Sequence, residues 1–97
     1  MIIAYKITGE FVGIYKNQSE AGRQTNTDIG NINHVINGKL SKTNDLTFLE
    51  IDSVSNEMIK GIGEIVMEFF RDNLSFKRYF NLVRNTCRLE PEESYPQ

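Results

Sequence analysis

Hydrophobic residues gather in two short runs at the start of the chain. Residues 2–7 (IIAYKI) and 11–15 (FVGIY) are rich in β-branched and aromatic residues, and Thr8-Gly9-Glu10 separates them. Runs of this composition around a short connection that contains glycine are typical of a β-hairpin. Residues 46–51 (LTFLEI) alternate well enough to add a third strand, which would close a small sheet.

Between these runs, the apolar positions change to a helical spacing. Ser19 can cap a first short helix that breaks at residues 25–26 (Thr-Asn), and residues 27–28 (Thr-Asp) can start a second helix that stops at Gly38. The apolar positions of the second helix are Ile29, Ile32, Val35 and Ile36. The positions left facing outward are Gly30, Asn31, Asn33, His34 and Asn37. Two short helices joined by a tight polar turn predict a helix-turn-helix.

From Ser55 onward, the pattern predicts two amphipathic helices. The first, of about five turns, carries one broad apolar stripe: Met58, Ile59, Ile62, Ile65, Val66, Phe69, Phe70 and Leu74. Residues 72–73 (Asp-Asn) weaken this helix, and Ser75 can cap another that reaches about Arg88. Residues 90–97 are polar and contain both prolines, which predicts a disordered tail.

The expected fold class is therefore α+β: a small β-hairpin, a helix-turn-helix and a third strand, followed by an amphipathic helical pair. The corresponding divisions are residues 1–52, 53–89 and 90–97. The helical pair has more apolar surface than two helices can bury against each other, so it needs a second surface. That surface is the sheet of the same chain, the same pair in a homodimer, or a mixture of both. The residues expected at a homodimer interface are Ile62, Ile65, Phe69, Phe76 and Phe80.

The net charge of −2 hides an asymmetry along the chain. Residues 1–43 carry five basic side chains against three acidic ones, a net charge of +2, whereas the remainder carries six against ten, a net charge of −4. Any affinity for nucleic acid is therefore expected in the first part. The small number of cations predicts that this affinity is modest.

The chemistry of the second short helix suits the reading of base edges. Asparagine can pair bidentately with adenine, and the N–H groups at a helix N-terminus can face phosphate oxygens. Arg23, Lys39 and Lys42 bracket the helix, where they either contact phosphates or form a solvated basic rim. Asp28 complements the helix dipole but lies where a phosphate would approach. The residues expected to bind DNA are Arg23, Thr27, Asn31, Asn33, His34, Asn37, Lys39 and Lys42.

The same region resembles the nuclease-associated modular DNA-binding domain family (NUMOD1), which overlaps the intron-encoded nuclease repeat motif. The resemblance covers about residues 5–49. It is carried by Gly9, Tyr15, Ser19, Glu20, Ala21, Arg23, Asn31, Ile32, Val35, Asn37, Gly38 and Lys39. It implies a double-stranded DNA-binding module of the kind attached to homing endonucleases of phages and mobile introns, with the second helix in the major groove. Two departures are Gly22, where the family usually has Ala, and residues 44–49, which replace a Gly-Gly-aromatic-x-Trp ending.

Readings as an enzyme are weaker than the DNA-binding one. Gly13-Ile14-Tyr15 matches half of a GIY-YIG nuclease signature, but no Tyr-Ile-Gly follows. Asn33-His34 hints at an HNH nuclease, but His34 is the only histidine of the chain. Cys87 has no histidine near it in sequence and is expected to be a small buried residue rather than a nucleophile. We therefore expect no catalytic residue, no metal site and no cofactor.

The remaining expectations concern partners and location. The apolar stretches are too short to span a bilayer, which argues against a membrane protein. A single cysteine and the lack of a secretory leader favour an intracellular, cytoplasmic setting, which for a phage protein is the host cytoplasm. Double-stranded DNA is the first expected partner. The alternative is a protein-interaction module in which the acidic half of the chain shields the basic face and the helices bind a host or partner protein.

Overall fold

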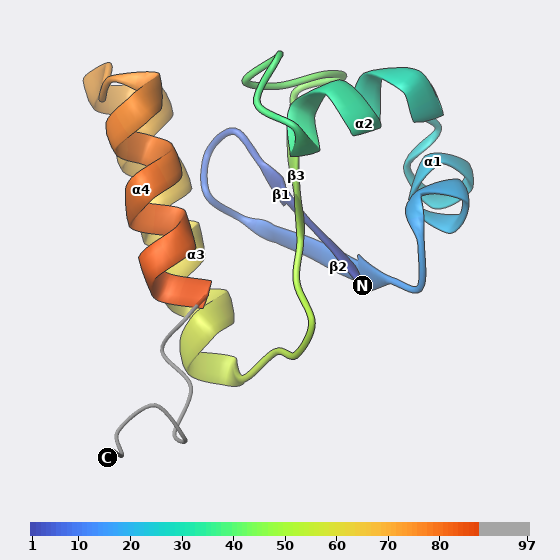
Figure 1. Cartoon of the computed structure of the whole chain (residues 1–97), viewed down its shortest axis with the longest axis horizontal. Helices are drawn as coiled ribbons and strands as arrows, with labels where there is room; N and C mark the ends of the chain where they lie inside the picture. The colour runs from blue at the N-terminus through green and yellow to red at the C-terminus, as the bar shows by residue number, and fades with distance from the viewer. Residues whose placement is uncertain (88–97) are drawn as a thin grey trace.

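The computed structural model describes residues 1–87 and has a mixed α+β architecture (Figure 1). In chain order the elements are β1 (Ile2–Lys6), β2 (Phe11–Tyr15), α1 (Gln18–Thr25), α2 (Ile29–Ile36), β3 (Leu46–Glu50), α3 (Asn56–Asp72) and α4 (Phe76–Cys87). The predicted fold class and the predicted order of elements are confirmed. The expected helical extension to Arg88 and the disordered tail at residues 90–97 lie outside the described residues.

The three strands form one antiparallel sheet with β1 in the middle, in the order β2-β1-β3. The connection between β1 and β2 is tight: Gly9 has a φ of +94°, and its N–H donates to the Lys6 carbonyl oxygen at 2.8 Å. Such a φ favours glycine because a side chain would be strained there. The pairing of β1 with β2 shifts register between Ala4 and Tyr5, which is the mark of a β-bulge.

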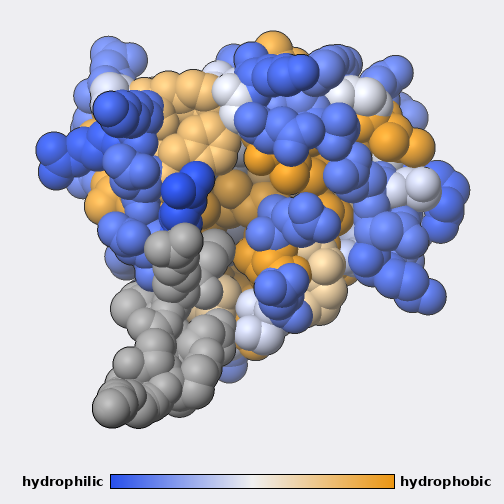
Figure 2. Space-filling model, viewed as in Figure 1, coloured by the Kyte–Doolittle hydropathy of each residue, from blue (hydrophilic) through white to orange (hydrophobic). Residues whose placement is uncertain are grey.

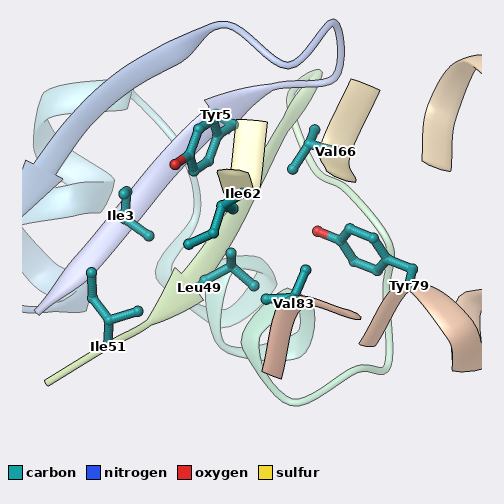
Figure 3. Packing of buried hydrophobic residues seen from close by; sticks show 8 residues of the cluster. All are labelled: Ile3, Tyr5, Leu49, Ile51, Ile62, Val66, Tyr79 and Val83. Atoms are coloured by element: carbon teal, nitrogen blue, oxygen red, sulfur yellow. The ribbon is translucent and has the colours of Figure 1, made fainter. Parts of the chain in front are cut away.

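One face of the sheet packs against α3 and α4 (Figure 3). Its core residues are Ile3, Tyr5, Leu49, Ile51, Ile62, Val66, Tyr79 and Val83. The two tyrosines are buried with partners for their hydroxyl groups: Tyr5 donates to the Ile59 carbonyl oxygen at 2.6 Å, and Tyr79 lies 3.4 Å from the Thr47 hydroxyl. A buried hydroxyl without such a partner would destabilise the fold. Both tyrosines can therefore serve as core residues.

The other face of the sheet packs against α1 and α2. Its core residues are Ile2, Ala4, Ala21, Ile32, Val35 and Phe48. Successive residues of a strand point to opposite faces, so β1 supplies Ile3 and Tyr5 to one core and Ile2 and Ala4 to the other. The sheet is thus the middle of three layers, with α1 and α2 on one side and α3 and α4 on the other (Figure 1). This arrangement explains why four successive residues of β1 are buried.

The helical pair therefore covers the sheet of its own chain. Ile62, expected at a homodimer interface, is fully buried inside a single chain and is a core residue that a second copy cannot reach. Ile65, Phe69, Phe76 and Phe80 are half-buried. Phe69 stacks on Tyr79, with ring centroids 4.3 Å apart, and also on Phe76, at 5.8 Å.

Most helix ends agree with the sequence prediction, with one correction. The first helix is capped by Asn17, not Ser19, because the Asn17 side chain accepts a hydrogen bond from the Glu20 N–H at 2.9 Å. Glu20 in turn accepts from the Lys16 N–H at 2.7 Å, which fixes the entry of the chain into α1. The N-caps of the later helices are Asp28, Ser55 and, by its bond to the Arg78 N–H, Ser75.

Among residues 1–87, no helix combines the length and the apolar character that crossing a membrane requires. The Gly13-Ile14-Tyr15 tripeptide forms the last three residues of β2, where Tyr15 packs against the core under α1 and α2. It is thus placed as an ordinary end of a strand.

Candidate nucleic-acid interface

The turn between α1 and α2 brings the two helices into close contact. Asn26 ends α1 in the left-handed conformation, with a φ of 54°, and the Thr27 N–H donates to the Gly22 carbonyl oxygen at 2.9 Å. A Cβ atom placed on Gly22 would lie only 2.8 Å from the Thr27 carbonyl oxygen and 3.0 Å from Ile29 Cγ1. The absence of a side chain at position 22 therefore permits this approach. The result is a helix-turn-helix with a three-residue turn.

Side chains of the turn are tied to the loop that precedes β3. The Thr27 hydroxyl donates to the Thr25 carbonyl oxygen at 3.1 Å and lies 2.9 Å from the Thr25 hydroxyl, whose single proton is shared with the closer Ala21 carbonyl oxygen at 2.6 Å. Asn44 Nδ2 donates to the same Thr27 hydroxyl at 3.1 Å and to the Thr25 carbonyl oxygen at 3.2 Å. Thr27, expected to bind DNA, thus has its hydroxyl proton and an acceptor position engaged within the protein. Sequence reasoning did not single out Asn44, because its partners are 17 and 19 residues away.

The outward face of α2 is polar and exposed. Ile32 and Val35 are buried against the sheet, whereas the four candidate base-reading residues Asn31, Asn33, His34 and Asn37 are exposed. Side chains two residues apart on an α-helix point in directions about 160° apart around the helix axis. Asn31 and Asn33 therefore lie on opposite flanks of the outward face, with His34 and Asn37 nearer its middle.

Amide groups form a hydrogen-bonded row across both helices. Asn33 Oδ1 accepts from Asn37 Nδ2 at 3.3 Å and from Gln18 Nε2 at 3.5 Å. Gln18 belongs to α1, so this row connects the first helix of the motif to the second. Sequence reasoning missed Gln18, because only the packing of α1 on α2 brings it next to Asn33. Such a row offers donors and acceptors to base edges from a rigid support.

Three cations were expected to contact phosphates, and all are exposed. Arg23 and Lys39 form no ion pair with any residue in the described range 1–87. Lys42 lies 4.0 Å from Asp45, a solvent-exposed ion pair of the kind that contributes little to stability. Asp28 accepts from the Asn31 N–H at 3.1 Å, so its carboxylate is used to cap α2.

An ion pair on α3, outside this region, shifts the pKa of both of its members. The Asp72 carboxylate accepts hydrogen bonds from Arg71 Nε at 3.0 Å and Nη2 at 3.1 Å. These bonds lower the pKa of Asp72 and raise that of Arg71, because they favour the charged form of each group. Both side chains are exposed, so this pair is a surface feature of α3 and not part of the helix-turn-helix.

The contact between α2 and α4 defines one edge of the candidate interface. Gly38 follows α2 with a φ of +84°, and a Cβ there would lie within 2.5 Å of Phe80 on α4. Glycine at position 38 therefore permits the left-handed backbone that ends α2, and it leaves room for the Phe80 ring of α4.

The surface formed by α1, α2 and the residues after α2 has the groups that a nucleic-acid interface needs. Exposed amides can pair with base edges, exposed Arg and Lys can neutralise phosphates, and the packed sheet can hold both in place. Comparisons with models of protein families, with curated proteins and with solved structures give no match to this chain.

Proposed function

We propose that this protein is a non-catalytic, sequence-preferring double-stranded DNA-binding protein that places α2 in the major groove. The observation that carries the proposal is the exposed amide row Gln18–Asn33–Asn37, held on a helix-turn-helix. Arg23 in the last turn of α1 and Lys39 just after α2 are exposed cations of the same motif. The resemblance to the nuclease-associated modular domain adds support. By that resemblance, the protein acts in transcriptional or replication control in a phage or mobile element, or is a relic of a homing endonuclease without its nuclease domain.

The openness of the face favours DNA over the competing proposal of a protein-interaction module. That alternative requires the acidic half of the chain to shield the basic face. Within residues 1–87, the side chains of α3 and α4 pack on the opposite face of the sheet from α1 and α2. The outward residues of α2 remain exposed. A duplex therefore has access to them.

The first prediction concerns the phosphate contacts of this face. Roughly four to five contacts give a slope of about −4 for log affinity against log salt concentration. The double substitution Arg23→Ala and Lys39→Ala should weaken binding to all duplexes alike and flatten the slope by about 2. Fluorescence anisotropy with a random duplex pool, repeated between 50 and 200 mM salt, measures both quantities.

The matched control is Lys6→Ala with Lys60→Ala, which removes two exposed cations that lie on β1 and α3. This control should leave the slope unchanged. Equal slopes for the wild type and the Arg23/Lys39 variant would contradict the phosphate assignment. A wild-type chain that binds no duplex at low salt would contradict the proposed function itself.

A further inference from the structure

Two of the three basic residues described on α4, Lys77 and Arg84, lie on one flank of the helix. The sequence of α4, FKRYFNLVRNTC, contains no Asp or Glu, and Lys77, Arg78 and Arg84 are all exposed. Lys77, Asn81 and Arg84 follow the i, i+4, i+7 spacing, which places them in a single row along the helix. We call Lys77, Asn81 and Arg84 the α4 stripe. Arg78 points to a different side, about 100° away from Lys77.

Arg84, the C-terminal member of the α4 stripe, lies beside the C-terminal end of α2. Asn37 and Arg84 line the same surface groove, whose apolar walls are Ile36, Leu49, Phe80 and Val83. Figure 2 shows an apolar hollow between the polar surfaces of α4 and α2. The amide row of α2 ends at Asn37, so Arg84 stands across the groove from the end of that row. The two polar surfaces are therefore neighbours, although about 40 residues separate them in sequence.

Two carboxylates of α3, Glu64 and Glu68, lie on the other side of α4. Glu64 and Glu68 of α3 line a second surface pocket together with Thr86. Thr86 and Arg84 are two positions apart, so they point about 160° away from each other. Within residues 1–87, the ion pairs are Lys6–Glu10, Lys42–Asp45 and Arg71–Asp72, and none of them involves a cation of α4. One opposing charge does line the groove, the exposed Glu50.

We propose that the α4 stripe is a second binding surface for the phosphate backbone of the DNA duplex that α2 reads. The proposal rests on the proposed function and assigns a further contact to it. Lys77 and Arg84 are about 10 Å apart along the helix axis, and each strand of a duplex carries one charge per about 3.4 Å along the duplex axis. Two cations at this spacing can reach separate phosphates of one strand while the neighbouring α2 occupies the groove. With the two stripe cations added to the roughly four to five contacts of the helix-turn-helix, the interface has roughly six to seven phosphate contacts, and the expected wild-type salt slope steepens from about −4 to about −6.

The test compares two variants that lose the same charge. The first, Lys77→Gln with Arg84→Gln, removes both cations of the stripe. The second, Lys60→Gln with Arg78→Gln, removes two exposed cations outside it. The stripe variant should flatten the salt slope by about 1.8, so that its affinity deficit shrinks about twelve-fold between 50 and 200 mM salt. The control should keep the wild-type slope, and both variants should keep the wild-type sequence preference.

A third variant tests the same groove with the opposite sign. Glu50→Gln removes the carboxylate that would repel a phosphate there, so it should tighten duplex binding at 50 mM salt. A gain of affinity cannot arise from misfolding. Unchanged affinity in Glu50→Gln, or an unchanged slope in the stripe variant, would overturn this inference while the proposed function stands, provided that the wild type binds duplexes.

Two further outcomes separate the proposals. A wild-type chain without duplex affinity overturns both. Phosphatidylserine vesicles serve as an additional probe of the stripe. If the stripe variant lost binding to these vesicles while its duplex slope stayed at the wild-type value, the stripe would belong to a membrane surface and the inference would be overturned.

Discussion

At the scale of single residues, Gly22 illustrates how a locally unfavourable choice can be required by packing. Glycine inside a helix costs up to about 1 kcal/mol relative to alanine, and the resembled family usually has alanine here. In this chain a Cβ at position 22 would meet the backbone carbonyl oxygen of Thr27 at 2.8 Å. Backbone atoms cannot move aside as the end of a flexible side chain can, so the contact outweighs the helix propensity.

The prediction at this scale is that Gly22→Ala destabilises the protein. Overpacking costs about 1–3 kcal/mol, and alanine regains up to about 1 kcal/mol of helix propensity, so a net loss of about 1 kcal/mol in the free energy of unfolding is expected. Urea denaturation measures it. The control is Gly61→Ala in α3, where a Cβ would meet only Thr86 Cγ2, at an ordinary 3.4 Å. The control should be stabilised. A Gly22→Ala variant at least as stable as the wild type would contradict the packing argument.

At the scale of elements, α2 combines two functions along one short helix. Ile32 and Val35 anchor it to the sheet, and its amides face solvent. Because Asn31 and Asn33 lie on opposite flanks, one helix in a groove cannot bring both to the same base pair. Asn33 is also oriented by Gln18 and Asn37, whereas Asn31 has its backbone N–H bonded to the Asp28 carboxylate.

The prediction for α2 is that Asn31→Ala and Asn33→Ala relax sequence preference at different positions of the preferred site. Each good bidentate contact discriminates by about 1–3 kcal/mol, and contacts to separate base pairs should add. Selection from a random duplex pool, followed by sequencing, gives the preference of each variant. Circular dichroism verifies that the helix is intact. A double variant that keeps the full ratio of preferred to random affinity would show that the reading residues lie elsewhere.

At the scale of the whole molecule, the three layers account for most of the apolar surface that led to the expectation of a homodimer. Ile62 is fully buried against the sheet, and Phe69 stacks on Tyr79 inside one chain. The exposed large hydrophobic residues of the described range lie on different elements and connections: Met1, Phe11, Ile29, Leu40 and Met67. Phe11 and Met67 line one surface pocket together. Single exposed apolar residues and small apolar patches of this kind are normal on a monomer.

The corresponding prediction is that Phe69→Asp unfolds the chain rather than dissociating a dimer. The substitution removes an aromatic stack and places a carboxylate among apolar rings, which should cost about 3 kcal/mol. Thermal unfolding and size-exclusion chromatography separate the two readings. The control Met67→Asp changes an exposed residue of the same helix and should have a small effect. A wild-type dimer that Phe69→Asp converts into a folded monomer would restore the homodimer proposal.

Much of the architecture was predictable because its signals are local. The hairpin, the two short helices, the third strand and the long helical pair all appear in the predicted order, since side-chain periodicity and capping residues act within a few positions of each element. Ser19 shows the limit of such signals. Asn17, only two residues earlier, is an equally good cap, and the geometry of the chain entering α1 selected it.

The tertiary structure decided what depends on contacts between distant segments. Four successive apolar residues of β1 made both faces of the sheet apolar, because neighbouring side chains point to opposite faces. Packing determined that α1 and α2 cover one face and that α3 and α4 cover the other. The same packing placed Gln18 beside Asn33 and gave the Tyr5 hydroxyl its partner on α3. It also set Arg84, which belongs to a chain segment with net negative charge, beside Asn37 at the end of α2. The net charge of a segment does not specify the direction in which a folded helix presents each side chain.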